Sequence, residues 1–313
     1  MIISEIYIVR KNRNRFCFSY YQEKKNKSGS FFISDKECDI LQGMKKIRIA
    51  QYEIEVEERK YPTASQLRIV LLSDLHGQEY GKENEQLVQL IVETKPDIIL
   101  VAGDLLTANL KGQEKVAVTL LKQLAKRYPI YYVNGNHEHQ IKMNTDYYGA
   151  KYLEYAQTIR EAGVQLLENT HADIHVKGLP LRIYGLELPA QYYRRISRSK
   201  PTSEEMKGYL GETQDTSYNL LLAHQPMCFR EYAKWGADLT VSGHLHGGFI
   251  RLPYLGGIIS PQLHIFPKYD KGIYTEQGKH LVVSAGLGSH SRLPRIGNPV
   301  EIVIVDLIKG GQG

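Results

Sequence analysis

The sequence predicts an α/β fold in which a sheet is covered by helices on both faces. Short, continuous apolar runs such as LRIVLLSD (67–74) and DIILVAGD (97–104) are typical of strands that are buried on both faces. Segments with helical spacing of apolar residues, at 84–94 and 115–127, alternate with these strands. The 313 residues are 42% hydrophobic, which is enough for a sizeable core.

The same alternation continues along the chain. PIYYVNGN (129–136) is predicted as a third strand, and 152–163 as a helix that ends at Gly163. HADIHV and LRIYGLEL have the pattern of a hairpin. Later strands are predicted at 218–224, 237–244, 279–286 and 300–307, with a helix at about 226–235. We find no repeat, low-complexity tract or linker that divides residues 44–313, and we predict one domain there.

Residues 1–43 differ from the rest of the chain. They are polar and basic and lack steady periodicity, and we treat them as an N-terminal extension. Translation starting at Met44 is one hypothesis for this boundary. A small β-hairpin and a flexible arm are the alternatives for the segment itself.

Charge and cysteine content limit the kinds of ligand and the cell compartment expected for this protein. The net charge is +6, and residues 1–43 account for +3 of it, so the body of the protein is only mildly basic. This balance does not predict nucleic-acid binding. Three scattered cysteines, Cys17, Cys38 and Cys228, indicate reduced thiols and a cytoplasmic protein. No apolar run is long enough for a membrane span, and the N-terminus does not resemble a signal peptide.

Polar residues follow five of the predicted strands. In an open α/β sheet, sites form beyond the carboxyl ends of the strands, so these residues are expected to converge. Alternation in an extended segment would place Asp74 and His76 on one side and Leu75 on the other. The candidate ligands are Asp74, His76, Asp104, Asn136, His224, His244 and His246.

These residue types predict a centre with two metal ions. Mixed carboxylate and imidazole ligands suit Mn²⁺, Fe or Zn²⁺ better than Ca²⁺. Seven ligands are too many for one ion but fit two ions that share a carboxylate. Any one of these histidines alone would more often be a hydrogen-bonded structural residue. The combination of all five strand ends is what favours the metal centre.

At this point the motifs resemble a known family. Asp-x-His (Asp74, His76), Gly-Asp (103–104), Gly-Asn-His-Glu (135–138), a lone His224 and Gly-His-x-His (243–246) are similar to those of the calcineurin-like metallophosphoesterases. The resemblance covers about residues 66–307. HQPMCFREYAKWGADLTVSGHLHGGFIRLP and GLGSHSRLPRIGNPVEIV also resemble the bacterial YkuE/YaeI-like phosphoesterases.

The resemblance implies a four-layer αββα sandwich of two mixed sheets flanked by helices. It also implies a role for each motif residue. Asp74, His76 and His246 would hold one metal; Asn136, His224 and His244 would hold the other; Asp104 would bridge them.

The Asn-His-Glu-His stretch at 136–139 takes several roles under this resemblance. His137 would not bind metal but would donate a proton to the leaving oxygen or hold the phosphate. Glu138 would orient ligands through hydrogen bonds. Gly135 would allow a sharp turn. His139 has no role in the family, and we interpret it as a surface or loop histidine.

The expected activity is that of a binuclear metal-dependent phosphohydrolase. Two divalent ions, with Mn²⁺ ahead of Fe and Zn²⁺, would attract an anionic phosphate and let a bound water attack phosphorus as hydroxide. A phosphodiesterase, or a pyrophosphatase acting on a nucleotide-linked lipid such as UDP-diacylglucosamine, is the expected type. A phosphorylated small molecule is the other substrate class, and peripheral membrane contact is compatible with it. The alternatives are a nuclease or cyclic-nucleotide phosphodiesterase, and a non-catalytic scaffold of the same fold.

Two positions depart from the family pattern. Thr107 stands where many relatives have an Asp that orients the catalytic His, and Phe249 follows Gly247-Gly248 where similar sequences have Gln.

Two roles are considered for several further residues. Arg292 and Arg295 are either grips for a second phosphate or solvent-facing loop residues. His264 and His290 are interpreted as structural or exposed. Five tyrosines in predicted loops are either an aromatic rim or ordinary packing residues: Tyr80, Tyr147, Tyr148, Tyr192 and Tyr193.

Overall fold

Two mixed β-sheets form the centre of the molecule. The computed structural model describes residues 4–10, 16–22, 47–57, 66–109, 112–193, 199–248, 250–252, 256–259, 266–289 and 295–310. The first sheet has eight strands in the order β2-β1-β3-β16-β4-β5-β6-β7, and the second has six in the order β14-β15-β11-β10-β9-β8. A separate two-stranded ribbon pairs β12 with β13.

The strands of the first sheet are β1 (Ser4–Arg10), β2 (Phe16–Gln22), β3 (Arg48–Val56), β4 (Leu67–Leu72), β5 (Ile98–Val101), β6 (Ile130–Tyr132), β7 (Val164–Leu166) and β16 (Glu301–Lys309). Strands β4 to β7 are parallel neighbours, whereas β16 runs antiparallel to β4 and parallel to β3. The long C-terminal strand therefore joins the N-terminal part of this sheet to its parallel part.

The second sheet contains β8 (Thr170–Val176), β9 (Leu179–Leu186), β10 (Tyr218–Ala223), β11 (Leu239–Ser242), β14 (Gly272–Glu276) and β15 (Lys279–Val283). Its four central strands, β9, β10, β11 and β15, are parallel, and antiparallel β8 and β14 form the two edges. The ribbon consists of β12 (Ile250–Leu252) and β13 (Gly256–Ile259).

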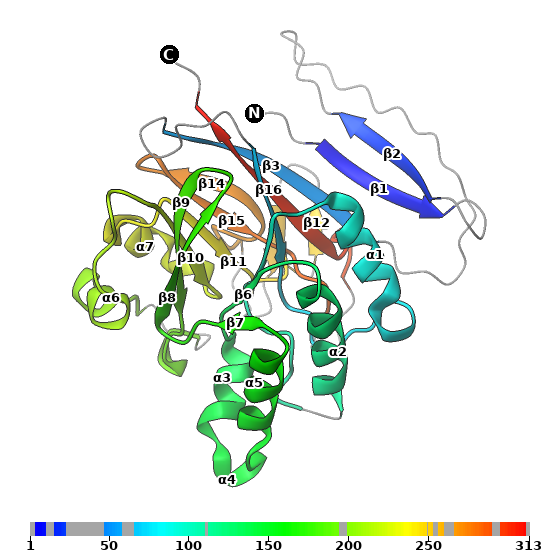
Figure 1. Ribbon diagram of the computed structural model, residues 1–313, viewed down its shortest axis with the longest axis horizontal. Coiled ribbons are helices and arrows are strands. Elements are labelled where there is room, and N and C mark those ends of the chain that lie inside the picture. The colour runs from blue at the N-terminus through cyan, green and yellow to red at the C-terminus, as the bar shows by residue number, and fades with distance from the viewer. Residues whose placement is uncertain are drawn as a thin grey trace.

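Helices cover the outer faces of both sheets. Those on the first sheet are α1 (Glu85–Thr94), α2 (Gln113–Ala125) and α5 (Lys151–Glu161), with the shorter α3 (Asn136–Met143) and α4 (Thr145–Tyr148) nearby. Those on the second are α6 (Ser203–Leu210) and α7 (Phe229–Trp235). Figure 1 shows α6 and α7 on one side of the strands and α1 and α2 on the other. The predicted αββα sandwich is confirmed.

The burial pattern of β4 explains why its last four residues, 69–72, are all apolar. Ile69 and Leu71 are in the core between the two sheets, whereas Val70 and Leu72 pack against the helices. All four side chains have 0% exposure, so neither face of the strand tolerates a polar residue. The next polar positions, Ser73 and Asp74, come directly after the end of the strand, and that is where the candidate site begins.

The predicted elements correspond closely to the observed ones, with differences at their ends. The strands predicted at 67–74, 97–104 and 129–136 included the polar residues that follow, whereas β4, β5 and β6 end before them, at Leu72, Val101 and Tyr132. Helices α3, α4 and α6 were not predicted. Asn136, at the end of the strand predicted over 129–136, is instead the first residue of helix α3.

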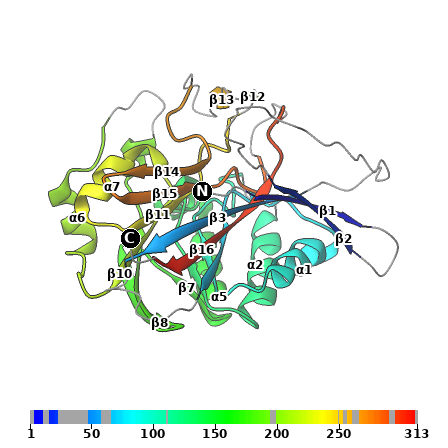
Figure 2. The same ribbon diagram turned by 90° about the horizontal axis from the view of Figure 1, so that it is seen from above.

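Residues 4–22 contain two paired strands. β1 pairs antiparallel with β2 and with β3, and Figure 2 shows both strands at the edge of the molecule. The division at residue 44 stays a prediction, and Met44 itself lies outside the described residues. Within the part of the chain that the structure describes, every helix is too short or too polar to pass through a bilayer.

Candidate metal centre

The candidate ligands from both sheets meet at one place. Asp74, Asp104 and Asn136 follow β4, β5 and β6 of the first sheet, and His224, His244 and His246 follow β10 and β11 of the second. Three groups have potential ligand atoms within 4.8 Å of one another: Asp74, His76 and His246; His76, Asp104 and His137; Asp104, His224 and His244. The site therefore lies where the carboxyl ends of the two sheets face each other.

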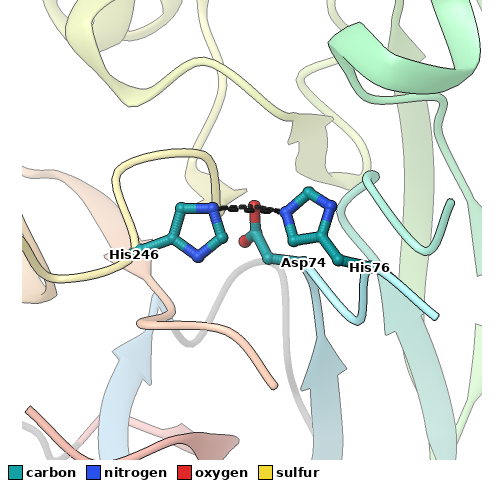
Figure 3. A group of neighbouring side chains, drawn as sticks. All are labelled: Asp74, His76 and His246. Carbon is teal, nitrogen blue, oxygen red and sulfur yellow. Dashed lines mark hydrogen bonds and ion pairs between the residues drawn. The ribbon is translucent and has the colours of Figure 1, made fainter. Parts of the chain in front are cut away.

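The first group is compact (Figure 3). His246 Nε2 lies 3.5 Å and His76 Nε2 3.8 Å from the same oxygen, Oδ1 of Asp74, and the two nitrogens are 3.2 Å apart. His76 Nδ1 lies 3.2 Å from the carbonyl oxygen of Leu106. If that nitrogen donates to the carbonyl, Nε2 has its lone pair free toward the group. Three donor atoms thus converge as a divalent cation requires.

The second group is organised around Asp104. His224 Nε2 is 3.0 Å from Asp104 Oδ2, and His224 Nδ1 is 2.6 Å from the carbonyl oxygen of Ala102. Asp104 also belongs to the group with His76, so it lies between the two sets of nitrogens. A carboxylate in that position can face two cations.

Two buried polar atoms test whether the site suits a cation. Asn136 Oδ1 has no hydrogen-bond partner among the described residues, and His224 Nε2 faces Asp104 Oδ2 at 3.0 Å without a well-directed hydrogen bond to it. A buried acceptor without a partner costs about 1–3 kcal/mol. Cations at this position would satisfy both atoms, and the mixed set of carboxylate, amide and imidazole donors suits a transition metal. The residues therefore fit the metal ions that the resemblance implies.

Burial and charge shift the protonation equilibria of the cluster. Six of the seven candidate ligands are buried: Asp74, His76, Asp104, His224, His244 and His246. Burial raises the pKa of Asp74 to about 6, although His224 opposes this. Burial also acts to raise the pKa of Asp104, but nearby His224 and His137 hold it well below its ordinary value. Burial acts to lower the pKa of His224, but Asp104, Asp74 and the carbonyl of Ala102 together raise it to about 9. In the metal-free protein, a proton on His224 therefore compensates the buried Asp104 carboxylate.

The backbone of the cluster is strained. Asp74, His76, Asp104, His244 and His246 all have positive φ, between 49° and 73°. Such values are uncommon outside glycine, cost about 1–3 kcal/mol each and concentrate at functional sites. The extended segments predicted around Asp74 and His76 are therefore wrong. Tight left-handed turns, and not strand alternation, bring these side chains together.

Glu138 connects the loops behind the cluster. Its carboxylate accepts hydrogen bonds from the backbone N–H groups of Asp104 (2.9 Å), Leu106 (2.8 Å) and Gly135 (3.0 Å). The hydroxyl of Tyr132 donates to it as well, at 2.9 Å. Burial and the Asp104 carboxylate raise the pKa of Glu138 to about 7. The side chain thus ties the loop after β5 to the start of α3.

Glycine is required at position 135 for a different reason from the predicted one. Its φ of −88° and ψ of −172° are ordinary extended values, so no unusual turn requires glycine. A Cβ at this position would lie 2.5 Å from the backbone nitrogen of Asp104, closer than real Cβ atoms approach. Glycine is needed because the loop after β6 packs directly against Asp104.

His137 is held by backbone groups. Its N–H donates to Asp104 Oδ1 at 2.9 Å, and its ring nitrogen Nδ1 accepts from the N–H of Ala108 at 3.0 Å. The Thr107 hydroxyl bonds to Gln113 and to the carbonyl of Asn109. The backbone of the neighbouring residue therefore does the orienting at the position where many relatives are expected to use an Asp.

His139 is not the surface or loop residue that was predicted. It lies on α3, its side chain is only 16% exposed, and its Nδ1 is 2.7 Å from Oε1 of Glu187. Glu187 also accepts from Lys142 and Asn134. His139 thus belongs to a polar network beside the cluster, which the sequence did not reveal because Glu187 is 48 residues away in the chain.

The segment 295–298 holds the loop that carries His244 and His246. The Asn298 amide donates to the carbonyl oxygens of His246 and Gly248, and Arg295 Nη2 lies 3.0 Å from His246 Nδ1. Asn298 was not among the predicted site residues, because one Asn in a Gly/Pro-rich loop has no distinguishing pattern. Arg292, His264, His290 and Phe249 lie outside the described residues.

The five loop tyrosines do not form one rim. Tyr80 and Tyr192 are buried, and the Tyr80 hydroxyl donates to the carbonyl of Leu287. Tyr147 is 83% exposed, and Tyr148 packs against it. The ring centroid of Tyr193 lies 5.3 Å from that of His244 and 6.1 Å from that of His224. For Tyr80 and Tyr192, ordinary packing is the better description.

Comparison with known proteins agrees with the geometry. A family model described as calcineurin-like phosphoesterase matches residues 67–248, more than half of the chain. An uncharacterized metallophosphoesterase of Aquifex aeolicus is 29% identical over 267 residues, which are 84% of this chain and 92% of that protein. The metallophosphoesterase YkuE of Bacillus subtilis is 27% identical, covering 72% of this chain and 73% of YkuE. The phosphodiesterase YaeI of Escherichia coli is 24% identical, covering 78% and 83%.

Proposed function

The chain belongs to the calcineurin-like phosphoesterase family, and from this premise we propose that it hydrolyses its substrate with two divalent metal ions. The family makes it a phosphoester hydrolase. The two-ion arrangement, the ligand set and Mn²⁺ as the preferred ion are our proposals. We also propose residues 44–313 as the phosphoesterase domain and residues 1–43 as an extension to it.

The observation that carries the two-ion proposal is the position of Asp104. It belongs to one potential ligand group with His76 and His137 and to another with His224 and His244. One cation would be held by Asp74, His76 and His246, and a second by Asn136, His224 and His244, with Asp104 facing both. The orphaned Asn136 Oδ1 supports the second set, because an amide oxygen without a hydrogen-bond donor is free to bind a cation.

The charge of this ligand set favours an anionic substrate. It contains two carboxylates, Asp74 and Asp104, so two divalent ions would leave the shell at about +2 by formal charge. When bound, such ions activate water as a nucleophile and neutralise charge on the phosphate oxygens. The chain's own contribution is a rigid, buried frame, because strained turns and the Glu138 hydrogen bonds determine where each donor atom lies.

We assign His137 to the substrate rather than to a metal. The N–H of Ala108 donates to its Nδ1, so in this arrangement the ring proton is on Nε2. A ring held in this tautomer can donate a hydrogen bond from Nε2 to a phosphate or leaving-group oxygen. General acid catalysis or hydrogen bonding of this kind contributes about 10²–10⁴-fold to rate.

For the substrate class we propose a phosphodiester or a pyrophosphate, including a nucleotide-linked lipid. The similarity to a protein named as a phosphodiesterase supports this choice. The cytoplasmic location and the peripheral membrane contact inferred from the sequence are proposals of the same kind. Within the described part of the chain, Cys228 is a buried free thiol, in agreement with a reducing compartment.

Release of p-nitrophenol tests the proposed function. Purified protein is assayed with bis- and mono-p-nitrophenyl phosphate, with Mn²⁺, Fe²⁺ or Zn²⁺, before and after treatment with a chelator. We expect turnover that the chelator abolishes and added metal restores, with the diester preferred. Absence of turnover with every metal would instead support a non-catalytic scaffold. Asp104→Asn is the inactive control, since it removes the shared carboxylate and keeps the side-chain shape.

A further inference from the structure

Arg295 is the cationic side chain next to the candidate ligands. Its Nη2 lies 3.0 Å from Nδ1 of His246 and donates to the carbonyl oxygen of Gly288. Its other two nitrogens, Nε and Nη1, are buried and have no hydrogen-bond partner among the described residues. A guanidinium therefore lies beside the centre with two donors that no described residue accepts from.

Unlike several other arginines in the described part of the chain, Arg295 has no carboxylate partner there. Arg68 pairs with Asp306, and Arg182 with Asp173; Arg251 also has an ion pair, with Asp270. In the described part of the chain, no carboxylate lies within 4.0 Å of Arg295, and Asp74 acts on it only at longer range. A buried charge without a partner is costly, and an anionic ligand removes that cost.

The contact between Arg295 and His246 suits only the metal-free centre. An N–H of Arg295 can donate to Nδ1 only if that nitrogen has no proton. His246 directs its Nε2 at Asp74, and a neutral imidazole that binds a cation through Nε2 carries its proton on Nδ1. Two donors would then face each other, so cation binding releases Arg295 from His246.

The position of Arg295 indicates which anion it takes. It contacts the side of the His246 ring that faces away from the group of Asp74 and His76. An anion on its free donors therefore lies next to the centre and not within it. A pyrophosphate has this shape, with one phosphate at the reacting position and a second beside it.

We propose that Arg295 binds the second phosphate of a pyrophosphate-type substrate and so sets the preference for two-phosphate over one-phosphate substrates. The inference rests on the proposed function and narrows its substrate class. Guanidinium is suited to this task, because its planar donors match the oxygens of a phosphate. Hydrogen bonds to charged groups of this kind correspond to about 10–100-fold in affinity.

The test measures the activity of three proteins toward two substrates and, separately, their affinity for Mn²⁺. Wild type, Arg295→Gln and Arg295→Lys are assayed with bis-p-nitrophenyl phosphate and with a nucleoside diphosphate sugar, which is also tested as a competitive inhibitor. Mn²⁺ affinity is measured by titration calorimetry. Arg127→Gln is the control, since Arg127 is exposed and follows α2.

We expect Arg295→Gln to raise KM or KI for the two-phosphate compound about 10–100-fold more than KM for the diester, with Arg295→Lys between the two. Mn²⁺ affinity should stay equal or become tighter, because the Gln oxygen can accept from a protonated Nδ1.

Three results would overturn the inference: equal changes with both compounds, weaker Mn²⁺ binding as the main effect, or no binding of the two-phosphate compound to wild type. If wild type hydrolyses neither compound with any metal, the proposed function itself fails. The two failures are therefore distinguishable.

Discussion

Replacing Gly135 with Ala tests whether close packing against Asp104 builds the centre. The backbone of Gly135 has φ −88° and ψ −172°, which alanine adopts without strain. The only new feature would be a Cβ, placed 2.5 Å from the Asp104 backbone nitrogen and closer still to its carboxylate. Any effect of Gly135→Ala therefore comes from displacing Asp104.

The size of the effect follows from how firmly Asp104 is held. Its N–H donates to Glu138 at 2.9 Å, its carbonyl accepts from the N–H of His76 at 3.1 Å, and its carboxylate accepts from the N–H of His137. Overpacking a site that cannot relax typically costs 1–3 kcal/mol, and each weakened hydrogen bond adds about 1 kcal/mol. We expect a loss of about 2–4 kcal/mol in the free energy of unfolding.

Urea unfolding of the metal-free protein and calorimetric titration with Mn²⁺ measure this prediction. Gly208→Ala is the matched control, because Gly208 lies in α6 with open space around its Cα. That exchange should stabilise the protein by about 0.5–1 kcal/mol, the ordinary gain of alanine in a helix. If Gly135→Ala is as stable as wild type and binds Mn²⁺ equally well, the reasoning about Asp104 is refuted.

Three further predictions concern single side chains. His137→Ala should bind Mn²⁺ as wild type does but lose about 10²–10⁴-fold in kcat; loss of Mn²⁺ binding would contradict its assignment to the substrate. Metal loading at pH 7.5 should release about one proton from His224, whose pKa is raised to about 9, and calorimetry in two buffers of different ionisation enthalpy measures it. The same shift stabilises the metal-free protein fully below the ordinary pKa of 6.5, and the contribution is lost as pH rises through about 9; a flat profile of stability against pH would exclude it. Asn298→Ala should cost about 1–3 kcal/mol in urea unfolding and weaken Mn²⁺ binding, because the carbonyls of His246 and Gly248 lose their donor; unchanged stability would show that the loop holds without it.

The order of the strands could not be obtained from local pattern. β16, from the end of the chain, inserts between β3 and β4, and Val303 pairs with Leu71 across 232 positions. Periodicity along the chain reports whether a segment is buried, but not which distant segment buries it. The assignment to two sheets came from the resemblance, and the structure supplied the order.

Local chemistry was sufficient to identify the candidate ligands. Asp74 and Asp104 are polar residues placed immediately after apolar strands, where a chain leaves the core, and this pattern is visible in the sequence alone. Strand β4 and helix α1 were also predictable from local pattern. The strand is a run of buried apolar residues, and the helix has its buried apolar residues at helical spacing.

Tertiary structure decided how those ligands are positioned. Three features depend on partners far away in the chain: the positive φ of Asp74, the packing of Gly135 on Asp104, and the hydrogen bond from Asn298 to the carbonyl of His246. Burial pattern and residue chemistry are properties of a segment, so the sequence by itself determined them. Backbone strain, close approach and the burial of donors such as those of Arg295 exist only where separate segments meet, because each arises from contacts that no single segment contains.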